Sequence, residues 1–573
     1  MDAKKVYEEW LADPYFDEDT KAELRAIAGD EKEITERFYK ELEFGTAGLR
    51  GIIGAGTNRM NMYTVRKATQ GLANYIIKCG AKEKGVAIAY DSRNMSPEFA
   101  DDAALTLAGN GIKAYVFESL RPTPELSFAV RYLNCTAGIN VTASHNPSKY
   151  NGYKVYWEDG AQITPPHDTG IMDEVRAVTD FTSVKTMSKE DAIAAGLYQV
   201  IGSDVDDPYI AAVKTQISNQ DAIDQMKDNI TIVYTPLHGT GNLPVRRVLN
   251  ELGFSKVNVV KEQELPDGNF PTVSYPNPEA EEAFELAMRD AKALDADLVL
   301  ATDPDADRLG VRVKDQDGGY HVLTGNMSGA LICEYIMSQK KEIPADGAIV
   351  KSIVSTNLMD AIAAYYKVDL IEVLTGFKYI GQKILQFEKE GKGTYLFGME
   401  ESYGCLPGTY ARDKDAVVAS VILCEAAAYY RTQGKTLWDV MIEMYERYGY
   451  YADEVESITL EGKEGLEKIA SIMDALKENT PDKLGSLKVL SKRDYTKDLI
   501  TDLASGETKP TGLPKSNVIY YDLENNAWAC VRPSGTEPKI KLYFGVKGTS
   551  LEDADKEAKA LKEALTAYMN QYM

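Results

Sequence analysis

Short apolar segments alternate with amphipathic ones along most of this chain, and this alternation limits the possible folds more than any other feature. The segment 85–90, GVAIAY, is typical of a buried strand, and the helix that follows it has proline near its start and glycine at its end. The same order of segments begins again near 228 and near 347. Alternating strands and helices predict α/β layers, in which ligands bind at the carboxyl ends of the strands.

The pattern changes after about residue 452. The segment 526–546 reads as two strands around a turn, and an amphipathic helix over 551–569 follows it. A length of 573 residues suits about three to five domains. We therefore predict three similar α/β domains and a C-terminal α+β domain, after a helical stretch of about forty residues. The predicted boundaries are 1–205, 206–325, 326–452 and 453–573.

Composition excludes several classes of partner. The formal net charge of -24 argues against nucleic acid and anionic membranes, although a local group of arginine and lysine could still hold a small phosphorylated ligand. The start of the chain lacks an apolar signal region, and no window approaches the roughly 18 apolar residues of a membrane helix. Six cysteines without C-x-x-C spacing indicate reduced thiols, so we expect a cytoplasmic protein. The sequence does not indicate an oligomeric state.

Three aspartates at alternate positions, Asp303, Asp305 and Asp307, follow the apolar segment LVLA. A calcium loop of the EF-hand type needs glycine at its sixth position and glutamate at its twelfth, where this chain has Arg308 and Lys314. Three carboxylates at the end of one strand instead favour a small divalent cation such as Mg²⁺ over a merely solvated acidic turn. A phosphate oxygen could complete such a site, with Arg308 neutralising its charge.

Three more loops carry polar residues at strand ends. Ser144, in the loop 142–154, is not a hydrolase nucleophile, because the G-x-S-x-G pattern is absent; a turn residue is the alternative. The loop 398–404 could bind sugar hydroxyls or could equally begin a helix. The loop 532–541 favours a phosphate cradle over an ordinary hairpin turn. Close in sequence to the loop 398–404 lie three candidates for binding a substrate phosphate: Lys378, Arg412 and Lys414.

Four motifs occur in a fixed order along the chain. They are Ser-His-Asn-Pro with Asn-Gly-x-Lys, then Asp-Pro-Asp-Ala-Asp-Arg, then Glu-Glu-Ser, then Arg-Pro-Ser-Gly-Thr-Glu-Pro, and EFGTAGLRG precedes them at 43–51. In this order they resemble the α-D-phosphohexomutase family, in its phosphoglucomutase/phosphomannomutase branch. The resemblance implies four domains around a central cleft, with one functional loop from each domain.

The resemblance also implies roles for particular residues. Ser144 matches the serine that is phosphorylated, Lys154 the general base, and Arg50 an arginine near the phosphoryl group; His145 and Arg308 match groups beside the phosphoserine. The implied magnesium ligands are Asp303, Asp305, Asp307 and the phosphorylated Ser144. The implied substrate-binding residues are Thr375, Lys378, Glu400, Ser402, Lys414, Arg532, Ser534, Gly535 and Thr536.

The same resemblance implies interconversion of glucose 1-phosphate and glucose 6-phosphate, with glucose 1,6-bisphosphate as intermediate and activator. In the bacterial dual mannose/glucose type a histidine follows the glycine of the sugar-binding loop, but here that loop runs Ser402-Tyr403-Gly404 without a histidine. That difference favours glucose over mannose. A phosphopentomutase or phosphomannomutase with the same mechanism stays open, as do a Mg²⁺-dependent sugar phosphatase and a non-catalytic sugar-phosphate binder.

Overall fold

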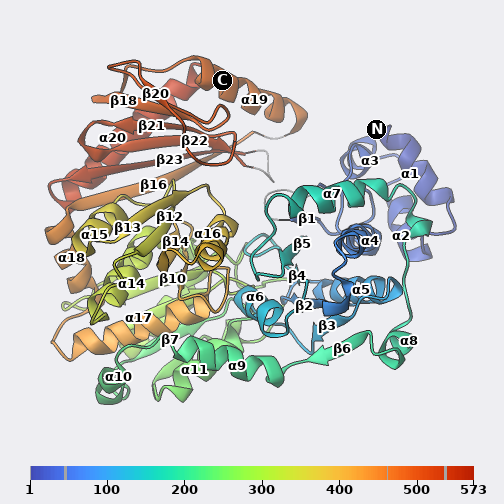
Figure 1. Ribbon diagram of the computed structural model, residues 1–573, viewed down its shortest axis with the longest axis horizontal. Coiled ribbons are helices and arrows are strands. Elements are labelled where there is room, and N and C mark those ends of the chain that lie inside the picture. The colour runs from blue at the N-terminus through green and yellow to red at the C-terminus, as the bar shows by residue number, and fades with distance from the viewer. Residues whose placement is uncertain (1, 44–47, 461, 535–538, 573) are drawn as a thin grey trace. The chain divides into compact units, whose positions relative to one another are not determined.

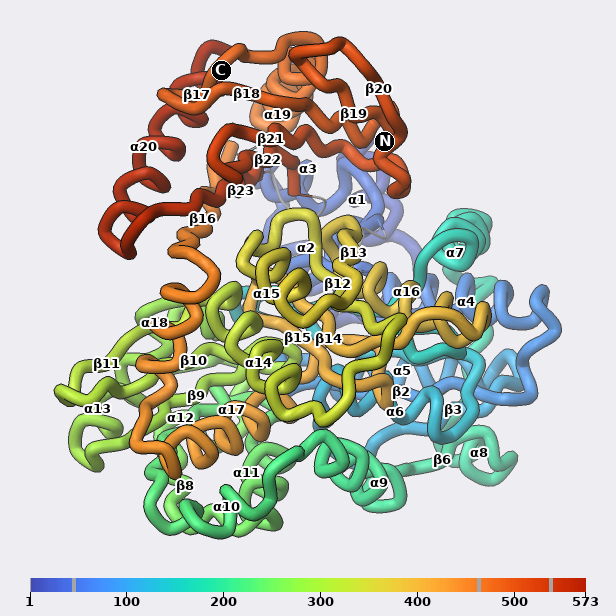
Figure 2. The backbone as a smooth tube through the Cα atoms, turned by 60° about the vertical axis from the view of Figure 1, so that its left-hand side comes forward, coloured from blue at the N-terminus to red at the C-terminus, as the bar shows by residue number. Residues whose placement is uncertain are grey.

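The computed structural model describes residues 2–43, 48–460, 462–534 and 539–572, which fall into two compact units (Figures 1 and 2). The first unit comprises 1–325, 377–392 and 402–436. The second comprises 326–376, 393–401 and 437–573. The four domain boundaries predicted from the sequence stay predictions, since these units divide the chain more coarsely.

Three short helices open the first unit, as the sequence predicts. Each begins after an aspartate, Asp2, Asp17 or Asp30, whose carboxylate accepts the N–H of the third helical residue. Such a cap stabilises a helix by about 1 kcal/mol. The apolar faces of the helices meet in one cluster that includes Trp10 and Phe38. The helices are α1 (Ala3–Ala12), α2 (Glu18–Ala26) and α3 (Glu31–Phe38).

The next sheet has six strands in the order β1-β5-β4-β2-β3-β6. Strand β2 pairs in parallel with β3 and β4, whereas β5 runs antiparallel to β4 and β1. Alternate residues of β2 enter different apolar clusters, Val86 and Ile88 one and Ala87 and Ala89 the other, because helices cover both faces. The strands are β1 (Leu49–Ile52), β2 (Val86–Tyr90), β3 (Ala114–Phe117), β4 (Ala137–Val141), β5 (Tyr150–Trp157) and β6 (Tyr198–Ile201). The helices are α4 (Met62–Lys78), η1 (Lys82–Lys84), α5 (Ser96–Gly109), α6 (Thr123–Tyr132), α7 (His167–Ala177), η2 (Phe181–Ser183) and α8 (Lys189–Ala194).

Strand β5 corrects one sequence interpretation. The segment 142–154 was expected to be a single loop, but its second half forms β5, so that Lys154 lies within a strand. Neither the serine nor the Asn-Pro turn signals this strand. It forms because β1 and β4 supply hydrogen-bonding edges on both of its sides.

The second sheet of the first unit has the order β11-β10-β9-β7-β8. Strand β9 pairs in parallel with β7 and antiparallel with β10, so the chain reverses between Thr302 and Leu309. The strands are β7 (Ile232–Thr235), β8 (Val257–Val259), β9 (Leu298–Thr302), β10 (Leu309–Lys314) and β11 (Tyr320–Leu323). The other elements of this unit are α9 (Ser203–Lys214), α10 (Gln220–Met226), α11 (Asn242–Glu251), α12 (Lys261–Glu264), α13 (Glu281–Leu294), α16 (Phe377–Glu390), β15 (Gly404–Pro407) and α17 (Ala416–Arg431).

The second unit contains a parallel sheet and a larger antiparallel sheet. The apolar segment near 347 forms strand β12, as predicted, and β12 pairs in parallel with β13 and β14 on either side. The strands of this sheet that belong to the second unit are β12 (Gly347–Ser352), β13 (Asp369–Val373) and β14 (Thr394–Glu400). The helices that accompany it are α14 (Gly325–Gln339), α15 (Leu358–Tyr366) and α18 (Leu437–Tyr448).

The antiparallel sheet follows α18 through the long strand β16, a path that Figure 2 shows in orange and red. Its order is β16-β23-β22-β21-β18-β19-β20, with β17 paired to β18. Side chains of two helices, α19 and α20, share one apolar cluster with this sheet, which confirms the α+β pattern predicted for the end of the chain. The elements are β16 (Tyr450–Thr459), α19 (Gly462–Glu478), β17 (Lys483–Leu484), β18 (Leu487–Asp494), β19 (Leu499–Asp502), β20 (Thr508–Lys509), β21 (Ile519–Leu523), η3 (Glu524–Asn526), β22 (Trp528–Pro533), β23 (Lys539–Gly548) and α20 (Leu551–Asn570). Within the described part of the chain, no helix combines the length and the apolar character needed to cross a membrane.

Candidate active site

Ser144 lies in the turn after β4, with its backbone in the left-handed region at a φ of 51°. The Ser144 N–H donates to Thr142 Oγ1 at 2.8 Å, and the Thr142 hydroxyl in turn donates to Asp91 Oδ2 at 2.6 Å. A non-glycine residue keeps such a backbone only where its surroundings enforce it. The turn therefore holds the serine in a fixed place at the edge of the sheet.

The Ser144 side chain faces an aspartate of the loop between β9 and β10. Its hydroxyl donates to Asp303 Oδ2 at 2.6 Å and lies 3.2 Å from His145 Nδ1. Only 3% of Ser144 is exposed to solvent. Two motifs that are far apart in the sequence thus form one site, as the motif order predicts.

The three aspartates between β9 and β10 form a group that could hold a metal ion. All three are buried, and one ligand atom from each lies within 4.8 Å of the others. Within the described residues, Asp305 Oδ1 and Asp307 Oδ1 are buried and have no hydrogen-bond partner. A buried acceptor without a partner is costly. Three buried carboxylates, two of which have an oxygen without a partner, therefore fit a hard divalent cation.

The electrostatics of the cluster support this fit. Burial raises the pKa of Asp303 well above its usual range, and the charges of Asp305 and Asp307 raise it further. Burial also acts to raise the pKa of Asp305, but the ammonium of Lys154 and hydrogen bonds outweigh burial and lower it. Carboxylates so close together cannot all ionise without a compensating cation.

Two lysines already compensate part of this charge. Lys154, on β5, donates from Nζ to Asp305 Oδ2 at 2.8 Å and lies 3.9 Å from Asp307 Oδ2. Lys414 Nζ lies 3.2 Å from Asp307 Oδ2 and 3.2 Å from Asp413 Oδ1. Lys414, predicted to bind substrate, thus lies beside the aspartates; its role and that of Lys154 stay predictions.

Two predicted arginines also approach this site. Arg50, on β1, donates to Asn146 Oδ1 in the serine turn at 3.1 Å. The backbone N–H of Arg308 donates to Asp303 Oδ1 at 3.1 Å, and its guanidinium donates to Glu279 Oε1 at 2.9 Å. Arg50 is thus positioned by the serine turn and Arg308 by the aspartate loop, the two loops in which the sequence predicts functional residues.

Other predicted substrate-binding residues divide between the two units. Lys378 and Ser402 belong to the first, where Lys378 is buried and burial lowers the pKa of its ammonium. Thr375, Glu400, Arg532 and Ser534 belong to the second.

In the second unit Glu400 ends strand β14 and is buried, and its Oε1 accepts the Gly376 N–H at 2.6 Å. Arg532 lies on β22, and the Ser534 N–H donates to Lys539 O at 2.7 Å. Gly535 and Thr536 lie outside the described residues. The substrate-binding roles of these residues stay predictions.

Arg412 lies in the protein interior. It was a candidate for a substrate phosphate, yet it is fully buried, and its guanidinium donates to the Glu388 carboxylate and the Thr409 carbonyl. Its charge is therefore already neutralised by Glu388.

Sequence reasoning missed Arg93, which holds the serine turn in place. Its fully buried guanidinium donates to the carbonyls of Ser144 at 2.5 Å, Asn146, Pro147 at 3.0 Å and Tyr150 at 3.1 Å. Burial lowers the pKa of Arg93 to about 10. The polar triplet 91–93 at the end of an apolar strand was the available signal, since the same rule identified the other loops.

We expect Arg93→Lys to lower kcat about tenfold to a hundredfold, because an ammonium cannot donate to four carbonyls in the fork geometry of guanidinium. KM for the sugar phosphate should stay within about twofold, since Arg93 supports the serine turn. Intact-mass analysis should show slower phosphorylation of the serine. Arg121→Lys is the matched control, because Arg121 is also buried but pairs with Asp206. An unchanged kcat in Arg93→Lys would contradict the positioning role.

A second missed residue is Thr123, at the start of α6. Its hydroxyl donates to Asp305 Oδ2 at 2.7 Å and accepts from Asn140 Nδ2 at 2.6 Å, and its backbone N–H donates to Asp305 O at 2.9 Å. Thr123 thus orients one aspartate of the metal group. No local sequence pattern distinguishes this threonine from an ordinary first residue of a helix.

The chain matches four domains of one family by sequence. They are the phosphoglucomutase/phosphomannomutase alpha/beta/alpha domains I, II and III over residues 41–181, 207–318 and 324–448, and the C-terminal domain over 464–564. The chain is 38% identical over 539 residues to a phosphoglucomutase of Staphylococcus epidermidis, with 93% of this chain and 95% of that protein covered. It is 38% identical over 530 residues to one of Staphylococcus aureus, with 92% and 94% covered.

Solved structures share the fold. The phosphoglucomutase pp63/parafusin of Paramecium, in an open form, matches with a TM-score of 0.68 at 17% identity over 93% of this chain and 96% of that one. A phosphoglucomutase/phosphomannomutase family protein of Burkholderia thailandensis matches with a TM-score of 0.65 at 19% identity over 91% and 97%. Fold and site thus define a phosphohexomutase architecture. The chain belongs to the phosphoglucomutase/phosphomannomutase family, which confirms the resemblance found in the motifs.

Proposed function

We propose that this protein is a sugar-phosphate mutase that interconverts glucose 1-phosphate and glucose 6-phosphate. The observation that carries the proposal is the Ser144 hydroxyl, which donates to Asp303 at 2.6 Å beside the buried aspartate group. A serine in that place is suited to carry a phosphoryl group next to a cation. The 38% identity to the phosphoglucomutases of Staphylococcus supports glucose as the sugar in this proposal.

Magnesium is the proposed cation, because an all-carboxylate set of ligands suits a hard divalent ion. The residues that would hold it are Asp303, Asp305 and Asp307, together with an oxygen of phosphorylated Ser144. Bound there, Mg²⁺ would neutralise charge on the phosphoryl oxygens during transfer. Thr123 and Lys154 would keep Asp305 oriented toward it.

Phosphoserine 144 gives its group to the free hydroxyl of a sugar monophosphate in the first half of the proposed reaction. The bond between phosphorus and the serine oxygen breaks, a bond from phosphorus to the sugar oxygen forms, and the hydroxyl proton passes to a base, for which Lys154 is the candidate. The resulting glucose 1,6-bisphosphate reverses its orientation and returns its other phosphoryl group to Ser144. Positioning and charge neutralisation supply most of the catalysis in such transfers.

The remaining predicted residues would hold the far end of the sugar phosphate. Glu400 and Ser402 would bind ring hydroxyls, because a carboxylate accepts from hydroxyl donors. The candidates for the distal phosphate are Thr375, Lys378, Lys414, Arg532, Ser534, Gly535 and Thr536. The two orientations of the bisphosphate require such a site to accept either end of the sugar, which rotating hydroxyl groups allow.

A panel of sugar 1-phosphates tests this proposal. With catalytic glucose 1,6-bisphosphate present, we expect kcat/KM for glucose 1-phosphate to exceed that for mannose 1-phosphate by about ten- to a hundredfold, because inversion at C2 leaves a buried partner unpaired. Glu400→Gln should slow both sugars and narrow this gap. Glu401→Gln should leave the sugar preference unchanged, since the Glu401 carboxylate already accepts the Ser352 hydroxyl at 2.9 Å.

The other outcomes of the panel separate the remaining candidates. Faster turnover of ribose or deoxyribose 1-phosphate would change the substrate to a pentose and leave the mechanism intact, and faster mannose turnover would contradict the interpretation of the sugar loop. Release of inorganic phosphate without mutase product would identify a phosphatase. Binding without transfer of label between substrate and Ser144 would identify a sugar-phosphate binder.

A further inference from the structure

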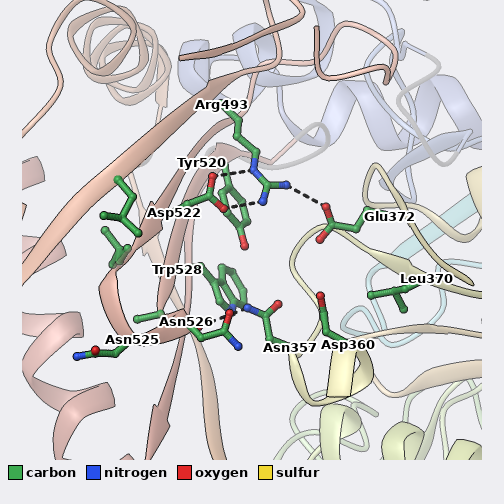
Figure 3. Close-up of a pocket in the computed structure, with 13 residues that line it drawn as sticks. Asn357, Asp360, Leu370, Glu372, Arg493, Tyr520, Asp522, Asn525, Asn526 and Trp528 are labelled. Carbon is green, nitrogen blue, oxygen red and sulfur yellow. Dashed lines mark hydrogen bonds and ion pairs between the residues drawn. The ribbon is translucent and has the colours of Figure 1, made fainter. Parts of the chain in front are cut away.

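The second unit contains a cavity of about 560 Å³ that none of the predicted site residues lines (Figure 3). One wall comes from α15 and β13, with Asp360 and Glu372. The other comes from β18, β21 and β22, with Arg493 and Asp522. The walls thus belong to residues matched by domain III and by the C-terminal domain of the family.

The charges around the cavity leave an excess of negative charge. Arg493 donates from Nε and Nη2 to both oxygens of Asp522, at 3.0 and 2.6 Å, and from Nη1 to Glu372 Oε2 at 2.9 Å. Lys351, fully buried behind the wall, lies 2.5 Å from Asp360 Oδ2 and 3.9 Å from Glu372 Oε1. Around the cavity three carboxylates are paired with only two cations, so one negative charge is not balanced, and the whole chain has a net charge of -24. A phosphate or carboxylate ligand is repelled there, and an ammonium is attracted.

The aromatic groups of the cavity do not offer a stacking surface. Figure 3 shows the Tyr520 ring between Arg493 and Trp528. The guanidinium lies over the Tyr520 ring at 4.4 Å, and the two aromatic rings stack at 5.5 Å with an interplanar angle of 4°. Tyr520 and Trp528 are both buried, so neither ring has a face free to stack, which disfavours a nucleobase or another flat ligand here. The aliphatic lining includes Leu370 and Leu490, and 43% of Leu490 is exposed.

We propose that this cavity binds a small aliphatic amine. The ammonium would lie near the carboxylates of Asp360 and Glu372, and the methylene groups would pack against Leu370 and Leu490. Excess negative charge beside an aliphatic wall suits an alkyl ammonium better than a sugar phosphate. Strand β22 begins at Trp528 in the cavity wall and carries Arg532 near its other end, so an occupant would contact the strand that leads to the predicted phosphate-binding loop.

Isothermal titration of the full chain with three four-carbon probes tests the site. Putrescine carries two ammonium groups, 1,4-butanediol is its neutral counterpart, and succinate is its anionic one. We expect one putrescine to bind per chain, butanediol to bind at least tenfold more weakly, and succinate not to bind. None of the probes is a sugar phosphate, so the result is independent of the proposed mutase activity.

Matched variants test whether the amine binds in this cavity. Asp360→Asn, on α15, should weaken putrescine binding about tenfold, whereas Asp369→Asn, at the start of β13 and outside the cavity lining, should leave it unchanged. Leu490→Lys should abolish binding, because its own ammonium would occupy the cavity, and its exposed position should tolerate the change. Asp305→Asn should leave binding unchanged, because Asp305 is not among the residues that line the cavity.

The proposal is overturned by equal affinities for putrescine and butanediol, or by putrescine binding that survives both Asp360→Asn and Leu490→Lys. Loss of putrescine binding in Asp305→Asn would equally overturn it, since the amine would then occupy the aspartate group between β9 and β10.

Discussion

Ser144→Ala is expected to lower mutase turnover by about 10⁴-fold or more, because the variant has no oxygen that can accept and return the phosphoryl group. The hydroxyl that donates to Asp303 at 2.6 Å is the only group of this side chain that approaches the aspartates. Intact-mass analysis should show a species one phosphate heavier in the natural protein and none in the variant. Measurement of kcat with glucose 1-phosphate completes the test.

Two further variants separate chemistry from folding. Ser144→Gly also removes the hydroxyl but suits the left-handed backbone, whose φ is 51°, so it should fold at least as well and be equally inactive. Ser148→Ala changes a serine of the same segment and should keep normal turnover. Full mutase activity in either Ser144 variant would eliminate the phosphoserine assignment.

Asp305→Asn is expected to weaken Mg²⁺ binding and to lower kcat by about a hundredfold or more, because an octahedral site tolerates little change in its ligands. The same change removes the anionic partner of Lys154, whose Nζ lies 2.8 Å from Asp305 Oδ2. Breaking a buried ion pair by removing one charge costs about 3–5 kcal/mol, so the unfolding temperature should fall as well. Metal titration and thermal unfolding measure the two effects separately.

Chelation distinguishes the loss of metal from the loss of stability. EDTA should abolish the mutase activity of the natural protein, and added Mg²⁺ should restore that activity. Asp317→Asn, an exposed aspartate in the turn after β10, is the control and should respond to EDTA and Mg²⁺ as the natural protein does. Activity that persists after thorough chelation would contradict a metal role for Asp303, Asp305 and Asp307.

The order of the motifs was sufficient to predict the family. Polar residues at the end of an apolar strand identified Ser144 and the three aspartates, because strand ends place such residues where ligands bind in α/β folds. The same pattern was present at 91–93, where Arg93 proved to hold the serine turn. It was missed because the pattern marks a polar strand end but does not show that Arg93 would donate to the carbonyls of another loop.

Local sequence carries backbone propensity, apolar periodicity and capping signals, and these were enough for the strands, helices and polar loops described above. Contacts between distant segments depend on how the sheets bring strand ends together. The 2.6 Å hydrogen bond from Ser144 to Asp303, the support of Asp305 by Thr123 and the burial of Arg412 against Glu388 are contacts of this kind. The formation of strand β5 also depends on distant segments, because its pairing with β1 and β4 outweighs the turn signals in its own sequence. That pairing places Lys154 beside the aspartates.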